Sequence, residues 1–267
     1  MSGLDTLLRH ERAVVGGGLA ALTLLAWVVV WRGAGMGMSA LAMTSVTLFP
    51  HVQADAMKAM EPPEFPWATV LAMWWVMMIA MMTPSAAPLV LLYRRVARQA
   101  VGRTRANTIY VPSLFLILGY LVVWLGFSGV ATALQYVLQR DGVISRALWS
   151  TSALLSAAVL LAAGAYQLSP LKRTCLRHCR GPVEFLTNAW RPGRIGAFLM
   201  GLEHGVWCLG CCWMLMTLLF VGGVMNVVWI ALLALLVLAE KLAPAGATVG
   251  RAVGVVLIAW GIATLAV

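Results

Sequence analysis

Long apolar segments alternate with short polar ones along the whole chain. A transmembrane helix needs about 20 mostly apolar residues, and seven segments come close to that length. They lie at residues 14–31, 67–92, 109–138, 147–169, 195–221, 224–239 and 252–267. Because the last two are short and share a weak boundary, the pattern predicts an all-α, polytopic transmembrane helix bundle with six or seven spans.

The connections between these segments are too short to hold a second hydrophobic core, and the longest runs from Arg32 to Pro66. We therefore predict a single integral membrane domain over residues 1–267. The first segment also has features of a signal peptide, with two arginines ahead of an apolar run. Its length, and the Trp31–Arg32 pair at its end, favour a retained helix.

Composition supports the membrane assignment, since 62% of the residues are hydrophobic and 10% are charged, against about 25% charged in a typical globular domain. The net charge of +10 falls in clusters between apolar segments, without the aromatic interleaving of a nucleic-acid surface, so we expect no nucleic-acid partner. Successive connections lie on opposite sides of the membrane in this arrangement. Those on one side, with the N-terminal tail, contain 15 of the Lys and Arg residues, and those on the other side contain four. The positive-inside rule then predicts a cytoplasmic N-terminus in a bacterial inner (cell) membrane, with the lipid bilayer as partner.

The five cysteines lie within predicted spans or on the predicted cytoplasmic side: Cys175, Cys179, Cys208, Cys211 and Cys212. An odd number of thiols in a reducing compartment argues against a disulfide framework. Metal binding or redox chemistry is the more common use of such thiols.

One face of the predicted helix 195–221 carries soft metal ligands. At about 100° per residue, the residues on this face are Met200, His204, Cys208 and Cys211, with Cys212 at its edge. Such donors suit Cu(I) or Zn(II) better than hard ions. The stripe from His204 to Cys212 extends about 12 Å, so a second helix must complete any four-ligand site. The alternative is that the cysteines are small packing residues and the histidine a hydrogen-bond donor between helices.

Three neighbours of this stripe extend the prediction. Glu203 is expected to orient an imidazole or to accept a proton. Gly201 and Gly205 form a G-x-x-x-G pair that permits a second helix to approach closely, and we expect the methionine-bearing helix 67–92 to be that helix.

A second cluster follows the fourth span, where Cys175, His178 and Cys179 occupy positions i, i+3 and i+4 of a basic segment. On a helix they share one face, which predicts a separate metal loading or release site on the cytoplasmic side. The basic residues have an alternative role, which is to anchor the helix end to lipid headgroups.

Methionines are abundant, with 15 in the chain. Met73, Met77 and Met81 recur every four residues in the second span, as do Met78 and Met82. Thioethers are Cu(I)-compatible, and we predict Met77 and Met81 as relay or accessory ligands. Adaptable core packing is the alternative.

The chain resembles a bacterial family of predicted metal-binding integral membrane proteins. The resemblance rests on "MWWVMMIAMMTPSAAP", "YQLSPLKRTCLRHCRGP" and "GLEHGVWCLGCCWMLM", followed by "GVMN" and "EKLAP". It implies metal binding and suggests copper handling, and it supplies no catalytic residues.

We therefore predict an inner-membrane, soft-metal-binding protein of metal homeostasis that delivers or transports its ion. Cu(I) is favoured, Zn(II) is possible, and a metal chaperone or a metalloenzyme is the expected partner. A binding role is favoured over an enzymatic one. The alternatives are a membrane thiol oxidoreductase that uses Cys208 and Cys211, and a structural membrane subunit. The sequence leaves the oligomeric state open.

Overall fold

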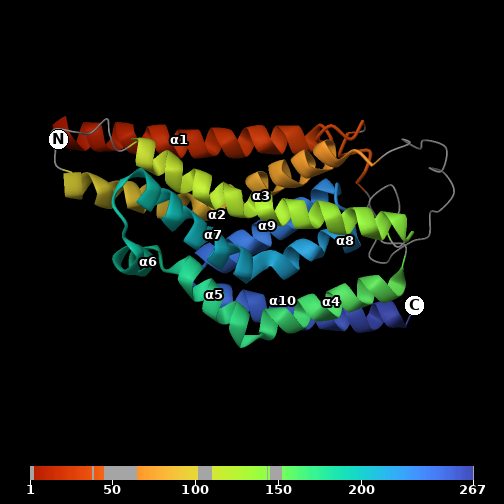
Figure 1. Ribbon diagram of the computed structural model, residues 1–267. Coiled ribbons are helices and arrows are strands. Elements are labelled where there is room, and N and C mark those ends of the chain that lie inside the picture. The colour runs from red at the N-terminus through yellow and green to blue at the C-terminus, as the bar shows by residue number, and fades with distance from the viewer. Residues whose placement is uncertain are drawn as a thin grey trace.

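A computed structural model describes residues 3–37, 39–44, 65–101, 110–142, 144 and 152–266. Within these ranges the regular elements are helices, which confirms the predicted all-α class (Figure 1). They are α1 (Gly3–Trp31), α2 (Trp67–Val101), α3 (Tyr110–Arg140), α4 (Ala153–Leu168), α5 (Pro170–Arg180), α6 (Pro182–Ala189), α7 (Gly193–Thr217), α8 (Leu219–Gly222), α9 (Val227–Leu242) and α10 (Gly246–Leu265).

Five helices in the described ranges are long and apolar enough to cross a membrane, namely α1, α2, α3, α7 (continued by α8) and α10. A sixth span results if α4 and α5, which meet at an angle of 63°, are counted as one bent unit. The predicted span 224–239 corresponds to α9, which has 16 residues. A helix of that length is about 24 Å long, shorter than a bilayer core of about 30 Å. The described residues therefore contain five candidate spans, or six with the bent α4–α5 unit, against the six or seven predicted.

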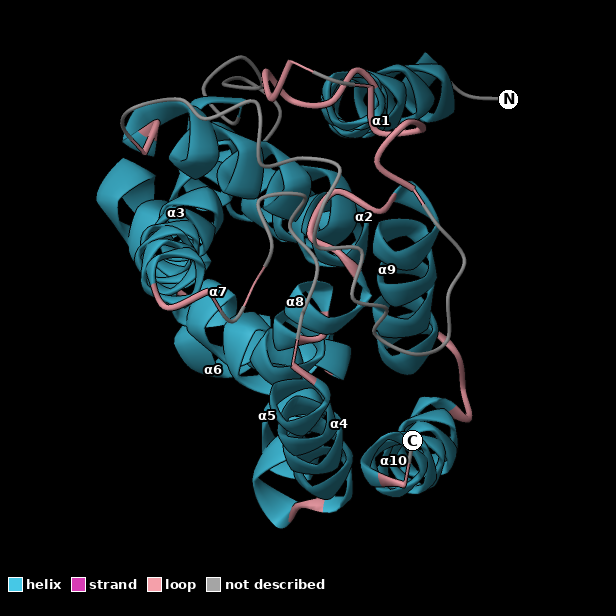
Figure 2. Ribbon diagram, turned by 90° about the vertical axis from the view of Figure 1, so that its right-hand side faces the viewer, coloured by secondary structure: helices cyan, strands magenta, loops and turns pink. Residues whose placement is uncertain are grey.

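The helices form an elongated bundle around α7. Its closest partner is α3, while α1 packs mainly on α2, and α4 pairs with α10. Figure 2 shows α1 at one edge of the bundle and the α4–α10 pair at the opposite edge. The N-terminal end of α1 and the short helices α5 and α6 lie at one end of the molecule, and the C-terminal end of α10 lies at the other (Figure 1).

The close contact between α3 and α7 depends on glycines from both helices. A Cβ on Gly201 would overlap the carbonyl oxygen of Leu116, and a Cβ on Gly119 would overlap that of Phe198. The predicted close approach at the G-x-x-x-G pair is thus confirmed, but the approaching helix is α3. The prediction of α2 was wrong because Gly119 lets the α3 backbone reach α7, whereas α2 turns bulky methionines inward.

The bend between α4 and α5 brings the second cysteine motif back toward α7. Pro170 occupies the first turn of α5, and the hydroxyl of Ser169 accepts a hydrogen bond from the Lys172 amide at 3.1 Å. This serine cap satisfies an amide of the first turn of α5 and so defines where the new helix begins. As a result, α5 packs along α7 instead of continuing away from the bundle.

Candidate metal centre

Sulfur atoms from three helices converge in the middle of the bundle. The thiol of Cys211 on α7 lies 3.8 Å from that of Cys179 on α5, and the thiol of Cys212 lies 4.0 Å from the thioether of Met82 on α2. The Cys208 thiol interacts with both Cys179 and Cys212. We call these five residues the sulfur cluster. All five cysteines of the chain are free.

The cluster joins two motifs that the sequence predicted as separate sites. Cys179 reaches the α7 thiols because α5 packs on α7, whereas its two motif partners point elsewhere. The His178 ring stacks on Trp207 with centroids 4.0 Å apart, and Cys175 is buried against the backbone of Gly210. The structure thus brings one residue of the predicted loading site to the predicted central site, and leaves the other two outside the sulfur cluster.

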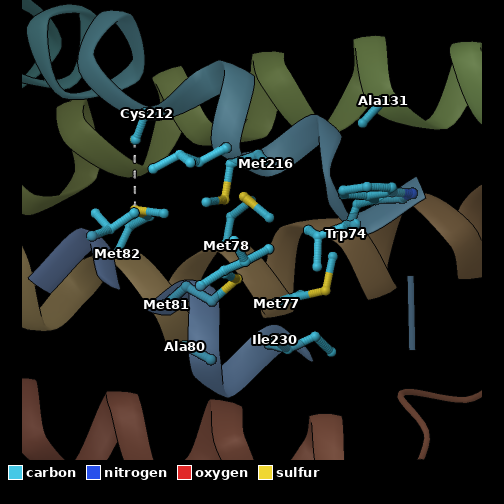
Figure 3. Close-up of a cluster of buried hydrophobic side chains, with 14 of the residues drawn as sticks. Trp74, Met77, Met78, Ala80, Met81, Met82, Ala131, Cys212, Met216 and Ile230 are labelled. Carbon is cyan, nitrogen blue, oxygen red and sulfur yellow. Dashed lines mark hydrogen bonds between the residues drawn. The ribbon is translucent and has the colours of Figure 1, made fainter. Parts of the chain in front are cut away.

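Further methionines continue from the cluster along α2. Figure 3 shows Met82 beside Cys212, then Met81 and Met78, with Met216 above them and Met77 beyond, toward Trp74. We call this set the methionine track; it comprises Met77, Met78, Met81, Met82 and Met216. The five side chains are almost fully buried, with exposed fractions of 0–1%. Met77 and Met81, the predicted relay residues, therefore lie on the track, while Met82 is the methionine that contacts a cysteine.

His204 is buried, with 3% exposure, and its Nδ1 atom has no hydrogen-bond partner. Its ring lies 6.1 Å from that of Tyr120 and 5.4 Å from that of Phe185. The carboxylate of Glu203 points away and pairs with Arg191 at 3.5 Å. The arrangement therefore gives no support to Glu203 as the group that orients His204.

Two polar contacts to Cys208 were absent from the sequence prediction. The Lys241 ammonium lies 2.9 Å from its sulfur and donates to the Ser85 hydroxyl at 3.2 Å. The Tyr120 hydroxyl lies 3.1 Å from the same sulfur and 3.1 Å from the Met82 carbonyl oxygen. The apolar run that ends in "EKLAP" was a usable signal for Lys241, because a charge at the end of such a run is costly unless it has a partner.

A buried ion pair between Lys172 and Glu240 fixes α9 beside α5. The Lys172 ammonium lies 2.6 Å from Oε2 of Glu240, and Oε1 of Glu240 accepts a hydrogen bond from Gln167 at 2.8 Å. Lys172 also donates to the Gln167 amide oxygen. Both carboxylate oxygens of Glu240 are therefore occupied, and the neighbouring Lys241 is directed to the sulfur cluster.

A cavity of about 170 Å³ lies between the cluster and the α5–α6 junction. Cys179, His204 and Lys241 line it, together with Ser85 and Arg180. Cys179 is half-buried, whereas the three α7 thiols each have an exposed fraction of 1%. Cys179 is consequently the cluster thiol that an incoming group meets first.

The donor types fit a soft monovalent ion better than a four-ligand structural site. Among the described residues, no group of three His, Cys, Asp or Glu side chains is arranged to hold a metal. The sulfur–sulfur distances of 3.8 and 4.0 Å join two pairs, Cys179 with Cys211 and Cys212 with Met82, and Cys208 interacts with one thiol of each pair. Thiolates and thioethers are ligands typical of Cu(I), which also binds stably to two or three sulfur atoms.

Comparison with known families matches residues 71–264 to a family model, PpoB2, described as a copper chaperone. The matched region begins in α2, ends in α10 and contains the whole sulfur cluster and Lys241. No curated protein and no solved structure matches the chain.

Proposed function

We propose that this chain, which belongs to the PpoB2 family of copper chaperones, binds Cu(I) within a bacterial inner membrane and delivers it to a partner protein. The partner is a thiol-bearing metal chaperone or a copper enzyme. The convergence of thiols from α5 and α7 with a thioether from α2 is the observation that carries the proposal. Cu(I) is the ion that such a donor set favours, and Zn(II) is the competitor.

Cys179 is the transfer residue in this scheme. It lines the cavity of about 170 Å³ and lies 3.8 Å from Cys211. A Cu(I) ion moves between thiols by forming a bond to the new sulfur before it leaves the old one. A half-buried thiol next to a buried one is suited to pass the ion between a partner's thiol and the cluster.

The methionine track borders the cluster on the side of α2, where Met82 contacts Cys212. Its thioethers are uncharged and lie in the apolar core of the bundle between Cys212 and Trp74 (Figure 3). Thioethers bind Cu(I) without adding charge, so a track of them lowers the cost of moving a cation through an apolar region. We assign Met77 and Met81 to this relay, as the sequence predicted, and add Met78 and Met82.

The proposal is tested by Cu(I) binding to the purified full chain under anaerobic, reducing conditions. Cys208→Ser and Cys211→Ser should each lower Cu(I) affinity by more than the roughly 10–100-fold that loss of an outer partner costs. Cys175→Ser is the matched control and should bind Cu(I) like the unmodified chain, because its sulfur packs against Gly210 outside the cluster. Unchanged affinity in the double variant Cys208→Ser/Cys211→Ser would reject the proposal.

A thiol oxidoreductase is the second candidate, favoured by the 3.8 Å between the sulfur atoms of Cys179 and Cys211. In that function the two thiols form a disulfide and pass two electrons and two protons to a quinone. The sequence pointed to Cys208 and Cys211 for this role, whereas Cys179 of α5 and Cys211 of α7 are the two thiols whose sulfur atoms lie 3.8 Å apart. Reversible Cys179–Cys211 disulfide formation in a chain that binds no Cu(I) would favour this candidate.

A further inference from the structure

Lys241 places a positive charge beside the sulfur cluster. In the proposed function this cluster also binds a second positive charge, the copper ion. Its ammonium is 2.9 Å from the Cys208 sulfur, and its side chain is 7% exposed. We propose that Lys241 is the counter-cation of the loaded cluster and that it makes the site prefer monovalent copper to divalent zinc. This inference rests on the proposed function.

The charge balance of the loaded site gives Lys241 this role. Cu(I) held by two thiolates has a net charge of minus one, and the Lys241 ammonium neutralises it. Zn(II) held by the same two thiolates is already neutral, and the ammonium then leaves one uncompensated positive charge. Because an unbalanced charge is costly in a buried, weakly polarisable site, the lysine favours the copper complex over the zinc complex.

Direct repulsion favours the same order of the two ions, although it does not by itself raise the Cu(I) affinity. For any fixed set of sulfur ligands, a nearby ammonium repels a divalent ion twice as strongly as a monovalent one at the same position. Zn(II) escapes this penalty by recruiting a third thiolate, which requires that one more thiol of the cluster loses its proton.

The surroundings of Lys241 hold its charge at the cluster. The nearest carboxylate along the chain belongs to Glu240, but Lys172 and Gln167 occupy its two oxygens. The guanidinium of Arg180, which lines the same cavity, donates to the carbonyl oxygens of residues 240, 243 and 244. Cys208 and the neutral hydroxyl of Ser85 are the hydrogen-bond partners that remain for Lys241.

The test compares Cu(I) and Zn(II) affinities of the purified full chain, each measured by competition with a chromophoric chelator of that ion. Lys241→Leu removes the charge and adds no metal ligand. We expect Cu(I) affinity to fall at least about tenfold, because the two-thiolate copper complex loses its counter-charge. Zn(II) affinity should fall less or rise, since the removed charge repelled the divalent ion more strongly. Lys241→Arg keeps the charge and should keep the affinity ratio close to that of the unmodified chain.

Arg177→Leu is the matched control, because it removes one positive charge from the exposed face of α5. Water screens that position, so the affinity ratio should not change. Lys241→Gln provides a second neutral variant, with a polar side chain that keeps a hydrogen bond to Ser85, and carries the test if Lys241→Leu does not elute as a single species.

The outcomes separate this inference from the proposed function. If the unmodified chain binds Cu(I) and the neutral variants keep its Cu(I)/Zn(II) ratio, the role of Lys241 is rejected and the copper function stands. Tighter Cu(I) binding in the neutral variants also rejects it, because the ammonium would then compete with copper. If the unmodified chain binds no Cu(I), both fail. A smaller Cu(I)/Zn(II) affinity ratio in the neutral variants supports the inference, provided that Lys241→Arg retains the ratio of the unmodified chain.

Discussion

At the scale of single residues, Met82 connects the methionine track to the thiols. Its thioether lies 4.0 Å from the Cys212 sulfur, and its side chain is fully buried. Met73, nine residues before Met82 in α2, is equally buried but is not part of the sulfur cluster. The two positions therefore separate a ligand role from a packing role for methionine in the same helix.

We expect Met82→Leu to weaken Cu(I) binding about tenfold or more, because leucine fills a similar volume but has no sulfur. The stability cost of such a volume-conserving exchange is below about 1.5 kcal/mol. Met73→Leu, the packing control, should leave the affinity unchanged. Chelator competition measures both variants, and equal effects from the two would show that the thioether of Met82 contributes packing alone.

At the scale of helices, two contacts fix the geometry of the cluster. The α3–α7 contact at Gly201 sets the position of Tyr120, whose hydroxyl lies 3.1 Å from the Cys208 sulfur. The buried pair between Lys172 and Glu240 sets the position of α9 relative to α5. Each contact lies outside the sulfur cluster, and we expect each to affect the proposed Cu(I) binding through the helix that it positions.

Gly201→Ala should separate α3 from α7, because the added methyl group would overlap the Leu116 carbonyl oxygen. Overpacking of this kind costs about 1–3 kcal/mol, and we expect a lower melting temperature together with weaker Cu(I) binding. Gly126→Ala is the control on α3, since nothing lies within 4 Å of its added Cβ. A variant at Gly201 that melts and binds like the unmodified chain would contradict the close contact.

Glu240→Gln should destabilise the protein, because it leaves the Lys172 ammonium buried without a carboxylate. Breaking one side of a buried ion pair costs about 3–5 kcal/mol. The double variant Lys172→Met/Glu240→Gln removes both charges and should recover part of the loss. Thermal unfolding of the detergent-solubilised protein measures both, and a single variant less harmful than the double one would argue against the pair.

At the scale of the whole molecule, charge is distributed unevenly between the two ends of the bundle. The basic helix α5 lies at the same end as the N-terminal end of α1 (Figure 1), which is the relative placement that the predicted topology requires. The cavity that leads to Cys179 is near this end, at the junction of α5 and α6. If this end is cytoplasmic, as the positive-inside rule predicts, the proposed exchange of copper through Cys179 takes place on the cytoplasmic side.

Reporter fusions test this orientation. A phosphatase that is active only outside the cytoplasm should be inactive when fused after residue 105 or residue 191, and active when fused after residue 55. These three positions lie in the basic connections 94–105 and 172–194 and in the connection 32–66. The reverse activity pattern would move the opening at Cys179 to the outer side and reverse the direction of delivery.

Local sequence was enough to predict the helical class, most of the helix positions and the buried stripe on α7. These features depend on local composition and on the 3.6-residue period, and both can be read along one segment. The bounds of α3, and of α7 together with α8, agree with the predicted segments to within a few residues. By contrast, α2 extends nine residues beyond its predicted end and α10 begins six residues before its predicted start. The stripe residues His204, Cys208, Cys211 and Cys212 are all buried, as their shared face predicted.

The packing of the helices determines which of the candidate ligands come together. Cys179 joins the α7 thiols while His178 stacks on Trp207, although the two residues are adjacent in sequence and share the same motif. The difference arises from the angle at which α5 packs on α7, and a helical wheel contains no information about neighbouring helices. The partner of Lys241 could not be predicted for the same reason, because Cys208 is 33 residues away in sequence and comes close only when α7 and α9 pack in the folded chain.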